Sequence, residues 1–147
     1  TIAAELAARF GAFSVQGEYA KATLEDTLGV APFANKQDLD TYYVQASYFL
    51  TEHTKPYDFK KGVFKSPKLN GEEGAVELKA RYDVIENKDN KDNSASVYTV
   101  GVNYYATPNT RFMIEYVKGE TDVNVTAAPA STDREAAAVT ARAQFNF

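Results

Sequence analysis

The feature that most constrains this chain is a strict alternation of apolar and polar side chains with a period of two residues. Between Val76 and Val84 every second residue is apolar, and the residues between them are charged. This is the pattern of a β-strand with one apolar and one polar face. It recurs in seven segments, at about residues 1–10, 13–24, 40–52, 74–86, 95–106, 110–122 and 135–147. We therefore predict a single antiparallel all-β unit over residues 1–147.

The length of the predicted strands indicates that they cross a membrane. Each runs for roughly 10–13 residues, whereas strands of soluble proteins favour about 5–6 and a tilted membrane-crossing strand needs about 9–11. The pattern therefore predicts part of a transmembrane β-barrel. Bacterial single-chain barrels have even numbers of strands, so a count of seven predicts that further strands of the same barrel precede this chain.

The connections between the predicted strands alternate in length. Short turns are expected at 10–13 and 106–110, and longer polar segments at 25–39, 87–94 and 123–134. Outer-membrane barrels combine short periplasmic turns with long external loops, so we expect the C-terminus on the periplasmic side. Segment 53–73 is long although it falls on the side of the short turns. The sequence leaves open whether it is a turn or folds into the pore.

Composition excludes two classes of protein. The net charge is −4, so no excess of Lys and Arg is available to neutralise nucleic-acid phosphates, and we expect no nucleic-acid partner. No apolar run approaches the roughly 18 residues of a membrane-spanning helix. The mean hydropathy of −0.41 does not exclude membrane-crossing strands, because these expose apolar residues to lipid only at every second position.

Aromatic residues gather near the ends of the predicted strands. They are Phe10, Phe13, Tyr42, Tyr43, Tyr48, Phe49, Tyr104, Tyr105, Phe112, Phe145 and Phe147. Rings at both ends of lipid-crossing strands form the interfacial girdles of outer-membrane barrels. The alternative is a soluble sandwich or barrel whose aromatic side chains fill the core. Strand length and the alternating connections favour the membrane barrel.

Residues that carry enzymatic chemistry are scarce. The chain has no Cys, a single His53, and no glycine-rich phosphate loop, HExxH motif or nucleophile elbow. One His without a second His or a Cys does not predict a metal site. We therefore expect no enzyme, no catalytic residue, no metal and no cofactor.

Basic residues on the polar faces are candidates for lining a pore. They are Arg9, Lys79, Arg81, Arg111 and Arg142. A charge facing lipid would cost about 2–4 kcal/mol at the midplane, so in a barrel these side chains point into the lumen, where they lower the barrier for anions. The alternative is ion pairing that only stiffens the wall. The carboxylates available for it are Glu5, Glu18, Glu77, Asp83 and Glu115.

A lysine-rich stretch lies between residues 55 and 68, with Asp58 as its one carboxylate. Its basic residues are Lys55, Lys60, Lys61, Lys65 and Lys68. We interpret this stretch as a basic collar at the periplasmic mouth that attracts anions. The alternative is a solvated turn, since loops are commonly charged.

The C-terminus forms an amphipathic strand that ends in two aromatic residues. Residues 138–147 read Ala-Val-Thr-Ala-Arg-Ala-Gln-Phe-Asn-Phe, with Phe145 and Phe147 on the apolar side. This end resembles the C-terminal assembly signal of bacterial outer-membrane proteins, which implies the barrel-assembly machinery as a partner. In a soluble protein the same strand would form an unpaired, aggregation-prone edge.

A closer resemblance covers nearly the whole chain. The blocks that carry it are Gly17-Glu18-Tyr19, residues 43–51 with Lys55-Pro56-Tyr57, residues 74–82, Asn103-Tyr104-Tyr105, Pro108-Asn109 and Arg111-Phe112-Met113. Together they resemble the C-terminal half of the phosphate-selective porin O/P family. The resemblance implies a 16-stranded trimeric outer-membrane barrel that passes anions such as phosphate.

The function we expect is therefore passive diffusion of anions or small solutes through a water-filled channel in the bacterial outer membrane. The expected partners are outer-membrane lipid and lipopolysaccharide, the barrel-assembly machinery, further copies of the chain in a trimer, and the N-terminal half of the same barrel. Two alternatives stay open: a self-contained barrel of about eight strands that conducts nothing, and a soluble up-and-down barrel that binds lipid.

Overall fold

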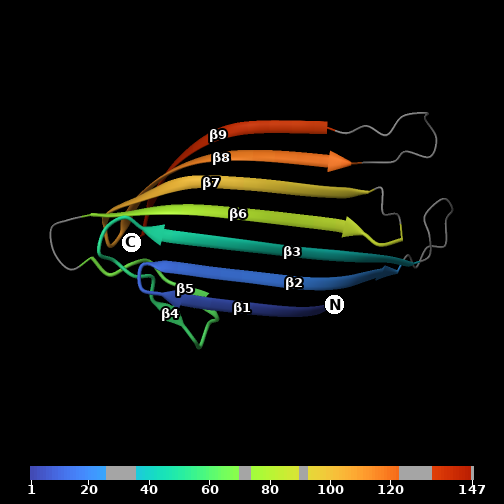
Figure 1. Cartoon of the computed structure of the whole chain (residues 1–147), viewed down its shortest axis with the longest axis horizontal. Helices are drawn as coiled ribbons and strands as arrows, with labels where there is room; N and C mark the ends of the chain where they lie inside the picture. Colours follow the sequence, from blue (N-terminus) through green and yellow to red (C-terminus); the bar gives the residue numbers. More distant parts are fainter. Residues whose placement is uncertain (26–35, 70–73, 90–92, 123–133, 147) are drawn as a thin grey trace.

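Seven long strands form one antiparallel sheet (Figure 1). The computed structural model describes residues 1–25, 36–69, 74–89, 93–122 and 134–146. The long strands are β1 (Ile2–Phe10), β2 (Phe13–Glu25), β3 (Lys36–Phe49), β6 (Ala75–Asn87), β7 (Ser94–Thr107), β8 (Thr110–Asp122) and β9 (Arg134–Phe145). Two short strands, β4 (Tyr57–Asp58) and β5 (Val63–Phe64), pair separately. No described helix is long and apolar enough to cross a membrane.

The predicted all-β fold and its seven long strands are confirmed. The third strand differs in its bounds, because it begins at Lys36 rather than near residue 40 and ends at Phe49 rather than 52. Its early start is stabilised by pairing with β2, where Thr23 donates a hydrogen bond to Asp38 over 2.7 Å. The small β4–β5 hairpin was not predicted, since two-residue strands leave no periodic signal.

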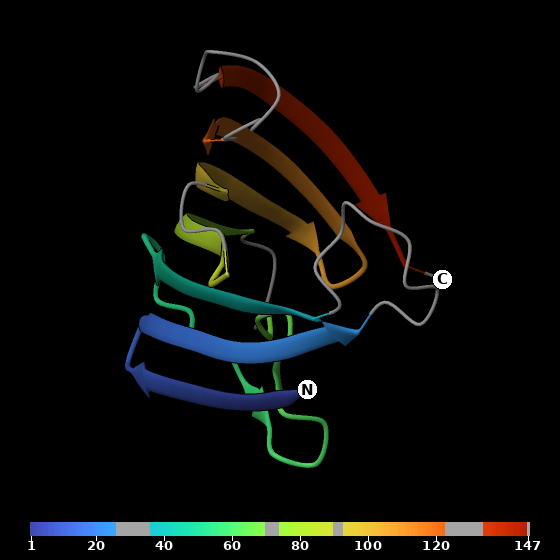
Figure 2. The ribbon, with the colours of Figure 1, turned by 90° about the vertical axis from the view of Figure 1, so that its right-hand side faces the viewer.

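Each long strand pairs with its neighbours in sequence, and the sheet follows a curved path from β1 to β9 (Figure 2). Among the described residues β1 and β9 form opposite edges and do not pair with one another. The short turns β1–β2 and β7–β8 lie at one end of the sheet, together with residues 50–69, whereas β2, β6 and β8 end at the other (Figure 1). The expected long segments at the second end fall largely outside the described residues.

Residues 50–69 lie against one face of the sheet, which we call the inner face. Phe49, Ala75 and Tyr105 are buried there, and Leu69 and Ala12 pack against them. The segment enters this position directly from β3, because the Leu50 amide donates to the Val76 carbonyl over 2.9 Å. The described part of the connection expected at 53–73, residues 53–69, is therefore not a simple turn.

The opposite face, which we call the outer face, is apolar and uncovered. Leu6 is 79% exposed, Ile114 60% and Val100 51%. A continuous apolar surface of this kind marks contact with another apolar phase rather than with water. The soluble alternative would instead place the aromatic residues in an interior, whereas Tyr48 and Tyr98 are among the rings exposed on this face.

Aromatic residues form two rows on the outer face. One row contains Phe10, Phe13, Tyr48, Tyr104, Phe112 and Phe145, and the other contains Tyr19, Tyr42, Tyr82, Tyr98 and Tyr116. The rows are six residues apart along β2, β3 and β7, which is about 20 Å of extended strand. Their placement matches the two interfacial girdles expected of a barrel wall.

Three of the aromatic residues expected in the girdles lie on the inner face instead. They are Tyr43, Phe49 and Tyr105, each adjacent in sequence to an aromatic residue of the outer face. Neighbouring residues of a strand point to opposite faces, so only one member of each aromatic pair can reach lipid. The inner member packs against the wall or the inserted segment.

Charged substitutions on the two faces should therefore differ in cost. We expect Val100→Arg to lower the free energy of unfolding of the protein in lipid bilayers by about 2–4 kcal/mol, because its side chain points outward. The neighbouring Thr99→Arg places the same residue on the inner face and should change this free energy much less. Urea titration of the intact protein in vesicles measures both, and equal losses would contradict the assignment of faces.

Candidate pore-lining site

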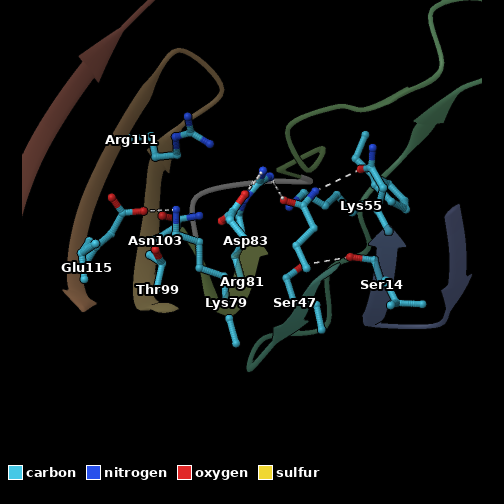
Figure 3. A pocket seen from close by; sticks show the side chains of 17 residues that line it. Ser14, Ser47, Lys55, Lys79, Arg81, Asp83, Thr99, Asn103, Arg111 and Glu115 are labelled. Carbon is cyan, nitrogen blue, oxygen red and sulfur yellow. Dashed lines mark hydrogen bonds and ion pairs between the residues drawn. The ribbon is translucent and has the colours of Figure 1, made fainter. Parts of the chain in front are cut away.

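All five cations predicted to line a pore lie on the inner face, but they do not form one cluster. Lys79, Arg81 and Arg111 surround a polar cavity of about 330 Å³, into which Lys55 reaches from the inserted segment (Figure 3). Arg9 lies at the end of β1 beside the β4–β5 hairpin, and Arg142 lies on the edge strand β9.

Arg81 is held rigidly by its neighbours. Its Nε and Nη2 atoms donate to the Asp83 carboxylate over 2.5–2.9 Å, and Nη1 donates to Gln45 Oε1 over 3.1 Å. The guanidinium carbon also lies 3.8 Å from the centroid of the Tyr43 ring. A guanidinium engaged by a carboxylate, an amide and an aromatic face has little freedom to bind a passing anion.

Lys79 is paired across the sheet with Glu115. These residues lie on β6 and β8, and the residue between them on β7 is Gly101. A Cβ atom at position 101 would lie 2.6 Å from the Ile114 carbonyl oxygen and 2.9 Å from Glu115 Cγ. The glycine therefore lets the ion pair cross a whole strand, and the charge of Lys79 is compensated within the wall.

Arg111 and Arg142 converge on a neutral acceptor. Arg111 Nη2 donates to Gln144 Oε1 over 2.7 Å, and Arg142 Nη2 approaches the same oxygen at 3.4 Å. Arg111 Nη1 also donates to the Tyr105 hydroxyl over 3.3 Å. Within the described ranges no carboxylate forms an ion pair with either guanidinium, so this part of the wall carries uncompensated positive charge.

Arg9 is the third of the five candidates that has no carboxylate partner among the residues the structure describes. Its Nη1 atom donates to the backbone carbonyl of Lys55 over 3.4 Å, which links β1 to the inserted segment. The five candidates thus divide into two that are ion-paired, Lys79 and Arg81, and three that are not.

The most buried charge on the inner face is Glu77, whose side chain is fully inaccessible to solvent. Its carboxylate accepts hydrogen bonds from Lys55 Nζ at 2.5 Å, the Tyr105 hydroxyl at 2.7 Å and Asn103 Nδ2 at 2.9 Å. The other polar atom of that amide, Asn103 Oδ1, is buried without a described partner. Three donors satisfy a charge that would otherwise be costly to bury.

The lysines expected to form a collar have different environments. Lys55 is bound to Glu77, and Lys65 forms an ion pair with Asp58 at 2.7 Å. Lys60, Lys61 and Lys68 are exposed. The stretch is therefore a folded hairpin with one lysine turned into the wall, not a uniform ring of free cations.

The hairpin that carries these lysines is ordered by its own contacts. The Tyr57 ring lies 4.9 Å from the Phe64 ring and 5.2 Å from the Phe59 ring, centroid to centroid. The Lys65 amide donates to the Pro56 carbonyl over 2.7 Å, and Gly62 closes the turn with φ near +66°, a conformation that glycine adopts readily.

The sequence did not reveal the importance of Glu77 on the inner face, nor that Phe64 of the inserted segment lines the cavity there. Glu77 was predicted only as one of several carboxylates that could pair with pore cations. A signal was present in the aromatic doublets Tyr48-Phe49 and Tyr104-Tyr105, which break the alternation at the ends of two strands. An aromatic residue on the polar face indicates that another part of the chain covers this face near the strand end.

The remaining predicted sites are placed as follows. Phe145 ends β9 on the outer face and is 57% exposed, whereas Phe147 lies outside the described residues. His53 forms a hydrogen bond with Thr51 Oγ1 at 2.8 Å and lies beside Phe49. Within the described part of the chain no group of three or more His, Cys, Asp or Glu side chains could hold a metal ion.

Comparison with known proteins agrees with this architecture. The family model described as phosphate-selective porin O and P matches residues 1–147. The chain belongs to the phosphate-selective porin O and P family. Porin O of Pseudomonas aeruginosa is 31% identical over 126 residues, a match that covers 76% of this chain and 28% of that protein. The chain thus spans less than a third of the length of this porin.

One ion pair of the hairpin predicts a dependence on pH. Lys65, by hydrogen bonding to the carboxylate, holds the pKa of Asp58 below its usual value of 3.8. Because the pKa is lower in the folded state, the pair stabilises the hairpin above about pH 3.8 and is lost as the pH falls through the folded-state value. We expect Lys65→Met to raise the Asp58 pKa, measured by carboxyl-carbon NMR titration. Lys68→Met is the control, and an identical shift in both variants would contradict the assignment.

Proposed function

We propose that this sheet is part of the wall of an outer-membrane porin that allows anions such as phosphate to diffuse passively. Membership of the porin family supports a channel. The observation that carries the proposal is the contrast between the two faces. The outer face is apolar and exposed, and the inner face holds Arg9, Arg111 and Arg142 without described carboxylate partners.

The unpaired guanidinium groups explain how such a wall would favour anions. A guanidinium presents several N–H donors in one plane and binds oxyanions by charge-assisted hydrogen bonds. In a water-filled pore these donors lower the barrier for an anion without removing its whole hydration shell. Lys79 and Arg81 contribute less to this field, because Glu115 and Asp83 compensate their charges.

A complete pore requires strands that this chain does not contain. The open edges β1 and β9 would be joined by the preceding strands of the same polypeptide, in agreement with the 28% of Porin O that the chain covers. We propose a 16-stranded barrel that assembles as a trimer, surrounded by lipid and lipopolysaccharide and inserted by the barrel-assembly machinery. Phe145 and Phe147 would act in recognition by that machinery.

The proposed sidedness follows from the ends of the sheet. The short turns, and with them the inserted segment, lie at one end, which we assign to the periplasm. Lys60, Lys61 and Lys68 would then be exposed near the periplasmic mouth, where they raise the local concentration of anions. Lys55 would lie deeper, between the segment and the wall.

Charge reversal in the intact protein tests the anion-selective wall. We expect Arg111→Glu and Arg142→Glu each to shift the reversal potential in a salt gradient toward cation permeation, because each replaces an unpaired cation on the inner face. Lys21 lies on the outer face in register with Ile2 and Asp40, and it pairs with Asp38. Lys21→Glu makes the same change of charge there and should leave the reversal potential unchanged. Planar-bilayer recordings measure all three.

Two results would overturn the proposal in different ways. If the intact wild-type protein forms no pores, the proposed channel function is wrong. If it forms pores whose reversal potential is the same in Arg111→Glu, Arg142→Glu and the wild type, the inner-face cations do not set selectivity.

A further inference from the structure

Glu77 has a role that its position on the wall alone does not explain. It is the only described acidic residue whose side chain is completely buried, and it lies where the inserted segment meets β6. We infer that Glu77 is a positioning residue that holds residues 50–69 inside the pore by binding Lys55, and so sets the width of the passage. This inference rests on the proposed porin function.

The Glu77 carboxylate is buried out of reach of solvent. An isolated carboxylate in a solvent-free site is strongly disfavoured, whereas one that is paired and fully hydrogen-bonded is tolerated. Asn103 and Tyr105 donate from the neighbouring strand β7, but neither carries a positive charge. Lys55 supplies the compensating charge, and it is the only described cation that forms an ion pair with Glu77.

Other contacts also hold the inserted segment in place. The β4–β5 hairpin has only two residues in each strand, and it pairs with itself rather than with the sheet. Its contact with β1 through Arg9 is a single hydrogen bond of 3.4 Å. Leu69 packs against Phe49 and Tyr105 at the far end of the segment. Between these points, the Lys55–Glu77 pair is the one buried ionic contact among the described residues.

A cavity lies between the inserted segment and the wall. Lys55 lies on one side of the 330 Å³ cavity, and Lys79, Arg81 and Arg111 lie on the other (Figure 3). Phe64 of the inserted segment also lines this cavity. The position of Lys55 therefore determines how closely the segment approaches the cations of the wall. If the ion pair were removed, the segment would be free to move away from the wall, and the cross-section available to ions would change.

A role limited to barrel stability predicts different behaviour. Loss of Glu77 would then reduce the amount of folded trimer but leave the conductance of each surviving channel unchanged. A positioning role predicts a change in single-channel conductance. It also predicts that the effects of Glu77→Gln and Lys55→Met are not additive, because both variants break the same contact.

The experiment uses the full-length protein in planar bilayers. We expect Glu77→Gln and Lys55→Met each to change single-channel conductance in the same direction and by a similar factor, and the double variant to change it no further. The charge-swapped variant Lys55→Glu/Glu77→Lys should move conductance back toward the wild-type value. Lys21→Met removes a lysine charge on the outer face without touching Glu77, and it should leave the conductance close to that of the wild type.

A second measurement covers the case in which a variant inserts poorly into bilayers. Tryptic cleavage after Lys60 and Lys61 in folded, detergent-solubilised protein should be faster in Glu77→Gln and Lys55→Met than in Lys68→Met. Unchanged conductance and cleavage in both variants would overturn the positioning role while leaving the porin function intact. Absence of pores in the wild type would instead overturn the proposed function.

Discussion

The structure depends on the register of one continuous antiparallel hydrogen-bond ladder. From β1 to β9 each long strand pairs with the next long strand in sequence, and among the described residues the register is irregular only near Tyr105 and Thr107, beside a turn. The alternation of inward- and outward-pointing side chains is therefore in phase across all seven strands. As a result, apolar residues accumulate on one face and charged residues on the other. A slip of one residue in any pair would place arginines such as Arg111 among the aromatic rows of the outer face.

Much of this arrangement can be predicted from the sequence, because the face to which a side chain points follows from its position within its own strand. The alternation around Val76–Val84 predicts both the strand and its two faces, and the ion pair between Arg81 and Asp83 joins residues two apart on one face. The pair between Lys79 and Glu115 is different. It depends on the register of three strands and on a glycine between the two side chains, and neither is visible in a single segment.

The inserted segment shows where prediction from sequence ends. Its lysines indicate a polar connection. The position of Lys55, however, is set by its ion pair with Glu77, which lies 22 residues away in the sequence. Glu77 is itself buried only because the segment covers it. The burial of Glu77 and its pairing with Lys55 depend on one another, so neither can be predicted from the sequence without knowing the other. The unpaired state of Arg111 and Arg142 is a similar case, since it reflects the neutral Gln144 that the register places beside them.

The central claim is that the polar face of the sheet borders water and the apolar face borders lipid. Single cysteines along β8 of the intact protein in outer membranes, each reacted with a charged, membrane-impermeant thiol reagent, test it most directly. The account predicts fast modification and reduced conductance at positions 111, 115 and 117, and no modification at 112, 114 and 116. Equal reactivity of the two sets would contradict it.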